Sequence, residues 1–234
     1  MNSITIQTLN KLNALADPLQ QDFLKTMVPS NKKVLGIKAP QLRLILKEAT
    51  EATKAYTNRQ KIDLAIEWVK TNVHEMAQMA YELIGFNKAL LSEVTKDDLK
   101  ALNYELDNWA SVDAYSVYLY GRAWKIGTLK DADLVKLVKS KNVWQRRVAV
   151  VSTIPLNRKD KKSLPQPDRT LMICDYVIAD YEDMVVKALS WALRELSKQE
   201  PDIVRDYIEK HRGVLHKRVL REVNNKLTYG TKNI

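Results

Sequence analysis

The seven residues from Asp107 to Asp113 (DNWASVD) combine a flat aromatic side chain, a possible helix start and a carboxylate. Trp109 lies four residues before Asp113, a spacing that places both on one face of a helix. A carboxylate there can stabilise a cationic transition state or position a water molecule. It can equally be structural, because negative charge in the first turn of a helix is favourable by ~0.3–1 kcal/mol, or because Asp113 pairs with Arg147. These residues alone leave both interpretations open.

The composition indicates which elements position this stretch. The chain has 234 residues, 45% of them hydrophobic, with only 6 Gly and 7 Pro, which favours helix and argues against an all-β sandwich. No apolar run is long enough to span a membrane, and the N-terminus does not resemble a signal peptide. The single Cys174 excludes an internal disulfide and a multi-cysteine zinc site. We therefore expect a cytoplasmic protein.

The charge of the chain is strongly positive. Lys and Arg number 38 against 28 Asp and Glu, a formal net charge of +10. This excess suits a polyanion such as nucleic acid, although a basic protein without such a partner would have the same composition.

The hydrophobic periodicity predicts helices that follow one another in pairs. The predicted helices span residues 4–16, 17–28, 40–46, 58–70, 73–85, 96–105, 111–124, 131–139, 143–154, 168–178, 183–198, 201–210 and 214–226. The connections are mostly short, except for a basic, proline-bearing insertion at 157–167. No segment has the sustained period-2 alternation of a strand. A two-helix unit of about 35 to 45 residues is typical of HEAT-like α-solenoids, and we expect one such domain over residues 1–234.

Alignment of the second helices gives a column of six equivalent positions. Its members are Arg43, Gln78, Asp113, Arg147, Lys187 and Arg218, at intervals of 35, 35, 34, 40 and 31 residues. In an α-solenoid the second helices line a concave wall, so the four cations of the column would face a ligand there, spaced to follow a phosphate backbone. Alternatively, such polar residues bond neighbouring repeats and contribute stability. Asp113 is the only acid of the column.

Two tryptophans are placed to act with this acid. Trp109 precedes Asp113, and Trp191 lies one helical turn after Lys187 on the same face, with Arg194 three residues further on. A Trp in an α-solenoid is more often part of the core, but in a basic groove its ring stacks on nucleotides or holds a cation.

Other types of site are not indicated. The three histidines are too scattered for a metal cluster, and the motifs GxGxxG, P-loop, HExxH and GxSxG are absent. Ser111 and Cys174 have no recognisable base partner, so we expect a helix cap and a small core residue.

The sequence resembles the AlkD-like DNA alkylation repair family of HEAT-like-repeat DNA glycosylases. Four segments carry the resemblance, in order and across nearly the whole chain: Val34–Pro40, Trp109–Asp113, Asn142–Arg147 and Lys187–Glu195. The resemblance implies an all-α solenoid whose concave basic face holds double-stranded DNA. It also implies hydrolysis of the N-glycosidic bond of cationic N3- and N7-alkylated purines, without extrusion of the damaged base and without a metal or cofactor.

The resemblance also implies residue roles. Asp113 corresponds to the catalytic carboxylate, Trp109 and Trp191 flank the deoxyribose of the lesion, and Arg147 lies in the same cleft. We further expect DNA contacts from Arg147, Lys187, Arg194, Arg43, Lys38 and Arg218, and a monomer with no obligatory protein partner.

Three positions depart from the usual family pattern. Lys38 replaces a glutamine, Met27 falls near an aromatic position that contacts DNA, and Asn108 replaces a second tryptophan. They bear on the substrate range and on activity, so two alternatives to a glycosylase stay open. One is a non-catalytic protein that binds DNA structures, and the other is a protein–protein scaffold.

Overall fold

The computed structural model describes residues 1–159 and 163–233, and within these ranges the chain is helical and contains no β-strand. Two compact units form, Met1–Leu119 and Tyr120–Ile234. The prediction of an all-α protein is confirmed, while the expectation of a single domain stays a prediction. Of the predicted basic insertion, Lys161 and Lys162 lie outside the described residues.

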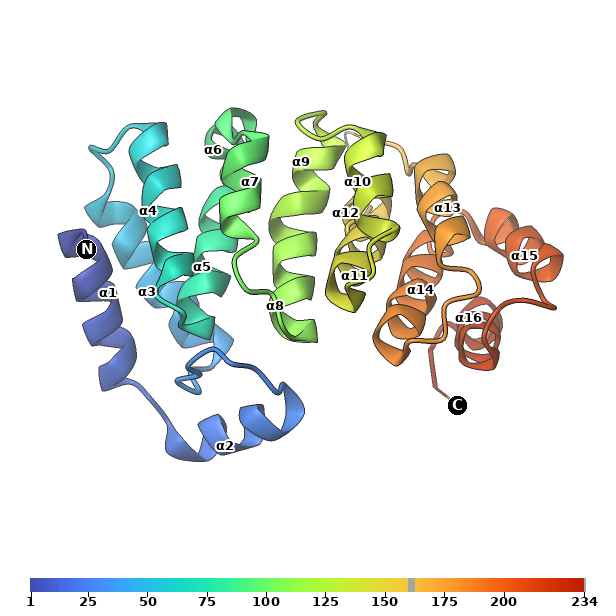
Figure 1. Cartoon of the computed structure of the whole chain (residues 1–234), viewed down its shortest axis with the longest axis horizontal. Coiled ribbons are helices and arrows are strands. Elements are labelled where there is room, and N and C mark those ends of the chain that lie inside the picture. The colour runs from blue at the N-terminus through green and yellow to red at the C-terminus, as the bar shows by residue number, and fades with distance from the viewer. Residues whose placement is uncertain (160–162, 234) are drawn as a thin grey trace. The chain divides into compact units, whose positions relative to one another are not determined.

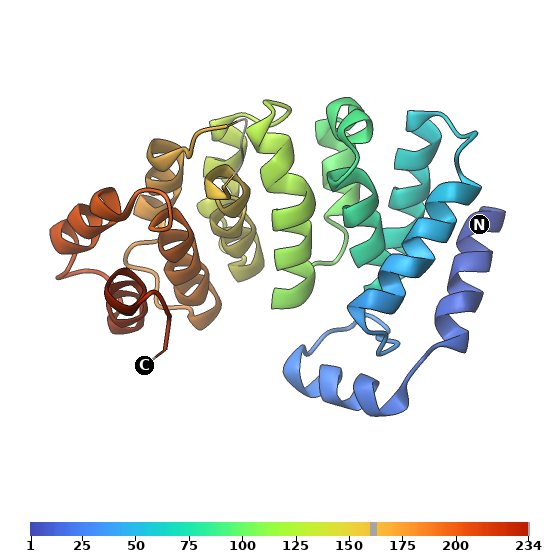
Figure 2. The same cartoon turned by 180° about the vertical axis from the view of Figure 1, so that it is seen from behind.

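The first unit consists of eight α-helices and the start of a π-helix, η1 (Figure 1). The α-helices are α1 (Ser3–Ala14), α2 (Pro18–Met27), α3 (Ala39–Ala52), α4 (Asn58–Lys70), α5 (His74–Gly85), α6 (Lys88–Glu93), α7 (Lys96–Leu102) and α8 (Trp109–Ala114), and η1 spans Tyr115–Tyr120. Both views show α2 lying crosswise to the other helices of this unit (Figures 1 and 2). None of the residues of α2 is buried.

The second unit also consists of helices within its described residues. They are α9 (Gly121–Lys125), α10 (Asp131–Val138), α11 (Val143–Val151), α12 (Ile154–Asn157), α13 (Pro167–Tyr176), α14 (Asp183–Leu196), α15 (Pro201–Lys210) and α16 (Lys217–Tyr229).

Helix pairs stack within each unit, as the repeat pattern predicts. In the first unit α4 packs on α5, and in the second α10 packs on α11, α13 on α14 and α15 on α16. The second helices of successive pairs lie next to one another: α3 with α5, α5 with α8, α11 with α14, and α14 with α16. This is the arrangement by which neighbouring repeats bury the apolar faces that a single pair leaves uncovered.

The predicted helix over 111–124 differs from the observed one. The helix begins earlier, at Trp109, and changes to a π-helix at Tyr115 before α-helical geometry resumes at Gly121. In this segment η1 approaches α5 closely, because the backbone of Tyr118 lies directly against Gly85. Such π-helical turns are frequent at functional sites, and this one begins two residues after Asp113.

Other boundaries follow from local capping. Asn87 accepts hydrogen bonds from the amides of Ala89 and Leu90 and so begins α6, a short helix that the periodicity did not indicate. The helix predicted over 214–226 begins instead at Lys217, where the ring of His216 accepts from the amide of Arg218. It ends at Tyr229 because Gly230 adopts the left-handed conformation (φ 74°) that closes a helix.

The core of the first unit contains large aromatic side chains with satisfied polar groups. Tyr81 and Tyr115 are fully buried, and their rings meet edge to face with centroids 5.4 Å apart. Their hydroxyls donate to the carbonyls of Leu102 and Leu99 at 3.3 and 2.8 Å. Because Leu99 and Leu102 belong to α7, these bonds attach η1 and α5 to the helix that precedes the Trp109–Asp113 stretch.

The segment Val34–Pro40 is organised around the carboxylate of Glu75, at the start of α5. This buried carboxylate accepts hydrogen bonds from the amides of Leu35 (2.9 and 3.1 Å), Gly36 (2.8 Å) and Ile37 (3.4 Å). Gly36 has φ 79°, and a Cβ at this position would lie 2.6 Å from the carbonyl oxygen of Asp17. A glycine is therefore required both by the backbone conformation and by the approach of α2.

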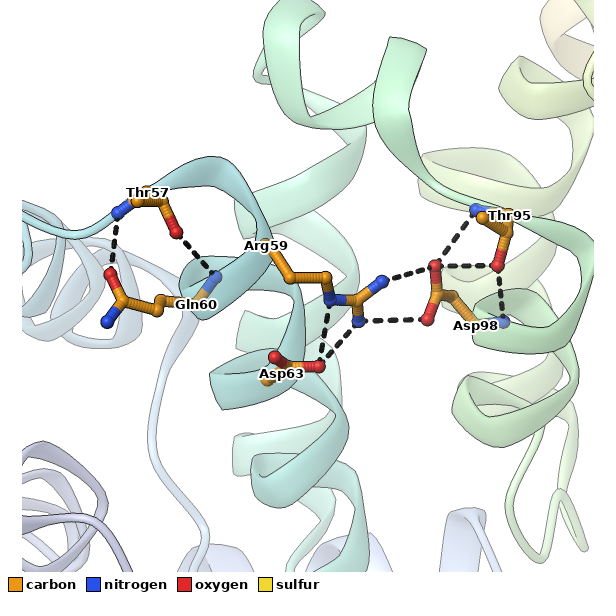
Figure 3. A network of polar contacts seen from close by, with 6 residues as sticks. All are labelled: Thr57, Arg59, Gln60, Asp63, Thr95 and Asp98. Carbon is orange, nitrogen blue, oxygen red and sulfur yellow. Dashed lines mark hydrogen bonds and ion pairs between the residues drawn. The ribbon is translucent and has the colours of Figure 1, made fainter.

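An ion-pair network joins the N-termini of α4 and α7 (Figure 3). Arg59 donates to both oxygens of Asp98 at 2.9 Å, and to Asp63 on its own helix. Asp98 also accepts from the amide and the hydroxyl of Thr95, which completes a capping box at the start of α7. Burial raises the pKa of Asp98, but the hydrogen bonds from Arg59 and Thr95 outweigh it and lower the pKa below its ordinary value.

The lowered pKa makes this network a source of pH-dependent stability. A carboxyl whose pKa is lower in the folded state stabilises the fold above its ordinary pKa, and this contribution disappears as the pH falls through the folded value. We expect Asp98→Asn to reduce the free energy of unfolding by about 2 kcal/mol at pH 7. In urea titrations the difference should shrink below the ordinary carboxyl pKa of 3.8. The exposed neighbour Asp97, changed to Asn, is the control, and a pH-independent difference would contradict the prediction.

None of the helices within the described residues combines the length and the apolarity needed to cross a bilayer.

Candidate functional site

The column of polar residues lies on the second helices. Arg43, Gln78, Asp113, Arg147 and Lys187 each occupy the fifth position of their helix, in α3, α5, α8, α11 and α14. Arg218 is the exception, because it is the second residue of α16, and the fifth position of that helix is held by Arg221. The register predicted for the first five members therefore agrees with the structure. The sixth member, Arg218, lies about one helical turn before the equivalent position, which is more than the one or two residues by which helix boundaries vary.

Trp109 and Asp113 occupy one face of α8 in the first unit, as their spacing predicts. Trp109 is the first residue of the helix and is 37% exposed, while Asp113 is half-buried. The indole nitrogen of Trp109 donates to the carbonyl of Met27, the last residue of α2, at 3.0 Å. The exposed ring is therefore held by its N–H group, which fixes its orientation at the surface near Asp113.

The start of α8 is set by Asn108, and the expectation that Ser111 caps this helix was wrong. The buried Asn108 accepts from the amide of Ser111 at 2.9 Å and donates to the Ser111 hydroxyl at 3.1 Å. Asn108 precedes the first helical residue and offers its side-chain oxygen to the third, which is the geometry of an N-cap. Asparagine is one of the residues preferred at this position, and a tryptophan could not accept this hydrogen bond.

Ser111 also has a possible base partner that the sequence did not reveal. Its hydroxyl oxygen lies 3.3 Å from Nδ1 of His74 at the start of α5. Burial lowers the pKa of His74, and the positive charge of Lys32 lowers it further, against the raising effect of Glu75 and Asp107. A neutral His74 can accept the Ser111 proton at Nδ1. Because Ser111 is buried, the contact connects α5 with α8 and does not present a nucleophile to a substrate.

Arg147, in the second unit, is buried, with 5% of its surface exposed. Its guanidinium donates to the carbonyl of Met184 near the start of α14, the next second helix. Its neighbour Arg146 forms an ion pair with Asp180 at 2.7 Å and donates to the carbonyls of Ser140 and Lys141. These contacts favour the alternative in which column residues join neighbouring repeats, and DNA contact by Arg147 stays a prediction.

Lys187 and Arg218 share one carboxylate, Asp183, in the first turn of α14. Lys187 forms an ion pair with it at 2.7 Å, and Arg218 contacts it from α16. Hydrogen bonding from Lys187 is the main cause that lowers the pKa of Asp183, and the charge of Arg218 adds to it. This acid is not among the residues predicted from the sequence, although its i,i+4 spacing to Lys187 was a usable signal.

A second missed acid is Glu222 of α16. This buried carboxylate accepts from the hydroxyl of Ser190 at 2.6 Å and lies 4.0 Å from the guanidinium of Arg194. Arg218 and Lys232 approach its other oxygen at 3.8 and 3.7 Å. Burial lowers the pKa of Arg194, and the charge of Glu222 opposes that effect. Arg194 is thus held by Glu222 and Ser190, and Trp191 is half-buried on the same helix.

The two cations predicted at the N-terminal end, Lys38 and Arg43, are both exposed. Lys38 immediately precedes α3, and Arg43 lies in its second turn. The structure thus places Lys38, Arg43, Trp109 and Asp113 in the first unit, and Arg147, Lys187, Trp191, Arg194 and Arg218 in the second. Cys174 is fully buried, as expected, and burial raises the pKa of its thiol.

No cluster of His, Cys, Asp or Glu that could hold a metal ion occurs within residues 1–159 and 163–233.

A profile of the family described as "DNA alkylation repair enzyme" matches residues 8–227. The chain belongs to this DNA alkylation repair enzyme family. The match covers all four segments on which the sequence resemblance depends and extends over both units. A search among curated proteins gives no match.

Solved structures agree with this DNA alkylation repair fold. A predicted DNA alkylation repair enzyme from Enterococcus faecalis is 19% identical, with a TM-score of 0.73, over 92% of this chain and 97% of that one. The structure of smu.31 from Streptococcus mutans UA159 is 21% identical, with a TM-score of 0.59, over 97% of this chain and 98% of that one. At these identities the likeness concerns the fold, which is the helical-repeat fold predicted from the sequence.

The departures from the family pattern have structural counterparts in this DNA alkylation repair protein. Asn108 is the N-cap of α8, and Met27 offers its backbone carbonyl to Trp109 while its side chain is exposed. Lys38 precedes α3 without a side-chain cap hydrogen bond. The departure at Asn108 therefore serves the geometry of the Trp109–Asp113 helix, whereas the backbone carbonyl at position 27 is independent of the side chain there.

Proposed function

We propose that this protein is a DNA glycosylase that hydrolyses the N-glycosidic bond of cationic N3- and N7-alkylated purines in duplex DNA. The observation that carries the proposal is the family match over residues 8–227, together with an exposed Trp109 and an acid, Asp113, on one face of α8. The net charge of +10 suits a DNA substrate. Base removal of this kind is the first step of base excision repair.

The proposed reaction requires little from the protein because the substrate is activated. The bond between C1′ of the deoxyribose and the purine nitrogen breaks, and its electron pair neutralises the cationic base, which leaves without needing a proton. Positive charge then develops on the sugar, and water adds to C1′ and loses a proton, which leaves an abasic site. Asp113 would stabilise the sugar cation and orient the water. The π face of Trp109 would stabilise the same charge.

The roles proposed for the second unit rest on the family motifs. Trp191 would contact the deoxyribose of the lesion, and Lys187, Arg194 and Arg218 would contact phosphates, as would Lys38 and Arg43 of the first unit. We also propose that the damaged base stays in the DNA helix during the reaction and that no cofactor takes part.

The test of the proposal is release of free 7-methylguanine or 3-methyladenine from methylated duplex DNA, detected by liquid chromatography and mass spectrometry. A known alkylpurine glycosylase is run in parallel. Release by this protein is the expected result. If only the parallel enzyme releases bases and this protein binds DNA, the protein binds DNA structures without catalysis. Absence of both binding and release would indicate a protein–protein scaffold.

The ion pairs of Asp183 lead to a prediction about DNA affinity. Because Asp183 pairs with Lys187 and Arg218, Asp183→Asn should free Lys187 for phosphate contacts and leave Arg218 with Glu222 as its remaining acid. We expect about threefold tighter binding to duplex DNA at low salt, and a slope of log K against log salt that steepens by about 1 to 2. Fluorescence anisotropy over a salt series measures both.

The matched control is Asp202→Asn, which makes the same change in net charge at an exposed ion pair with Arg205 on α15. If Asp202→Asn tightens binding as much as Asp183→Asn does, the effect comes from net charge and not from the two cations that Asp183 holds.

A further inference from the structure

The carboxylate of Asp107 joins two segments that are far apart in the sequence. It accepts hydrogen bonds from the hydroxyl of Ser30 at 2.8 and 3.1 Å, from the amide of Asn31 at 2.6 Å, and from the side chain of Asn108 at 2.8 Å. Burial raises the pKa of Asp107, but these hydrogen bonds and the nearby charge of Lys32 lower it overall. Asp107 is therefore ionised at neutral pH, and its bonds are of the stronger, charge-assisted kind.

Lys32 joins the loop after α2 to the loop that precedes Asp107 and to the loop between α4 and α5. It is 4% exposed and donates to the carbonyl of Tyr104 at 3.2 Å and to the side chain of Asn72 at 3.4 Å. Burial lowers the pKa of Lys32, and the charge of Asp107 is the foremost effect that opposes this. Asn72 and Glu105 adopt positive φ angles of 57° and 46°. Non-glycine residues keep such conformations only where their surroundings determine them strongly.

The loop that Asp107 holds follows directly after the hydrogen-bond acceptor of Trp109. Met27, whose carbonyl accepts the indole N–H, lies three residues before Ser30. The other end of α2 is held separately, because the amide of Asp17 donates to the carbonyl of Leu35. Since α2 itself has no buried residue, its Met27 end is held by the residues that follow it: the buried Val28, and Ser30 and Asn31, which Asp107 binds.

We infer that Asp107 is a positioning residue that holds the loop after α2 and thereby orients the ring of Trp109. Asp107 is connected to Trp109 in two ways. Along the chain, it precedes Asn108, the cap of α8. Through hydrogen bonds, it holds Ser30, which lies in the loop after Met27, the acceptor of the Trp109 indole. The consequence for base release rests on the proposed glycosylase function. The orientation of Trp109 itself does not.

The direct test is the indole proton signal of Trp109 in the NMR spectrum of the whole protein, assigned with Trp109→Phe. Asp107→Ala should move this signal upfield and speed its exchange with solvent at least about tenfold, because the Met27 carbonyl no longer protects it. The indole signal of Trp124, which donates to Asp131 in the second unit, should not move. Asp97→Ala, an exposed acid in the same unit, is the matched control.

Two milder variants distinguish positioning from a general loss of structure. Ser30→Ala removes one donor to Asp107, whereas Ser30→Thr keeps the hydroxyl. We expect Ser30→Ala to shift the Trp109 signal in the same direction as Asp107→Ala does. In Ser30→Thr the signal should stay at its position in the parent protein. If Asp107→Ala also moves the indole signals of the other tryptophans to unfolded positions, that variant has lost its structure, and the two Ser30 variants test the inference instead. A Trp109 signal that stays unchanged in Ser30→Ala and in a folded Asp107→Ala overturns the inference.

Base release gives the functional half of the test. In single-turnover assays Asp107→Ala should slow release about tenfold, because a small misplacement of a contact group raises the barrier. Its Kd for undamaged duplex should stay within about threefold of the parent. Equal release rates overturn the catalytic consequence. If the parent protein releases no base, the proposed function fails, while the Trp109 signal still reports whether Asp107 positions that ring.

Discussion

Asp113→Asn should slow the release of 7-methylguanine and 3-methyladenine by about 100-fold or more, because loss of one electrostatic stabiliser of a transition state has effects of this size. Asparagine keeps the shape of the side chain but carries no negative charge to stabilise the cation on the sugar. Binding of undamaged duplex should not weaken, since removal of a carboxylate reduces repulsion from phosphates. Single-turnover base release and fluorescence anisotropy measure the two quantities separately.

The structural interpretation of Asp113 makes a different prediction. The structure does not place Asp113 in the first turn of its helix, because α8 begins at Trp109 and Asp113 is its fifth residue. If its charge nevertheless only stabilises the fold, Asp113→Asn should lower the melting temperature and leave the release rate of the folded protein unchanged. Asp97→Asn, in the first turn of α7, is the control for a charge that stabilises a helix start without facing substrate. Equal release rates for Asp113→Asn and its parent would remove this carboxylate from the mechanism.

Gly85→Ala should have the largest effect on stability. A Cβ at this position would lie 1.7 Å from the carbonyl oxygen of Tyr118 and 2.6 Å from its carbonyl carbon. Both atoms belong to the backbone of η1, so no side-chain rotation relieves the overlap and the π-helix has to move. We expect the free energy of unfolding to fall by about 3 kcal/mol or more, at the upper end of overpacking effects. Urea titration followed by circular dichroism measures the change.

Gly213→Ala provides the matched control for the glycine substitution. Its Cβ would meet no atom within 4 Å, so the free energy of unfolding should change by no more than about 0.5 kcal/mol. Because η1 begins two residues after Asp113, the folded fraction of Gly85→Ala should also release bases more slowly than the parent. Stability equal to that of Gly213→Ala would show that η1 accommodates the methyl group without cost.

The sequence by itself determined the features that depend on local periodicity. Apolar residues that recur at helical spacing place the helices, and the intervals near 35 residues place Arg43, Gln78 and Asp113 at the same turn of successive second helices. The four-residue spacing of Trp109 and Asp113 puts them on one face because the helix repeats every 3.6 residues. These relations need no information about the packing of the chain.

Only the tertiary structure decided what each polar residue contacts. Arg147 and Lys187 are both cations at the fifth position of a second helix, yet one is buried against the carbonyl of Met184 and the other is exposed beside Asp183. The difference comes from the neighbouring helix, which lies more than 30 residues further along the chain for Arg147. Helical periodicity says which face a residue occupies, but not which partner covers that face.

The Asp107–Asp113 stretch illustrates the same limit. Its residue types predicted a helix start with an aromatic ring and an acid, and the structure agrees. The cap proved to be Asn108 instead of Ser111, and the partners of Asp107 and Trp109, Ser30 and Met27, come from the loop after α2 and its last turn. Those contacts join residues more than 75 positions apart. The folding of the first unit brings them together, and the burial of these groups decides which hydrogen bonds they must make.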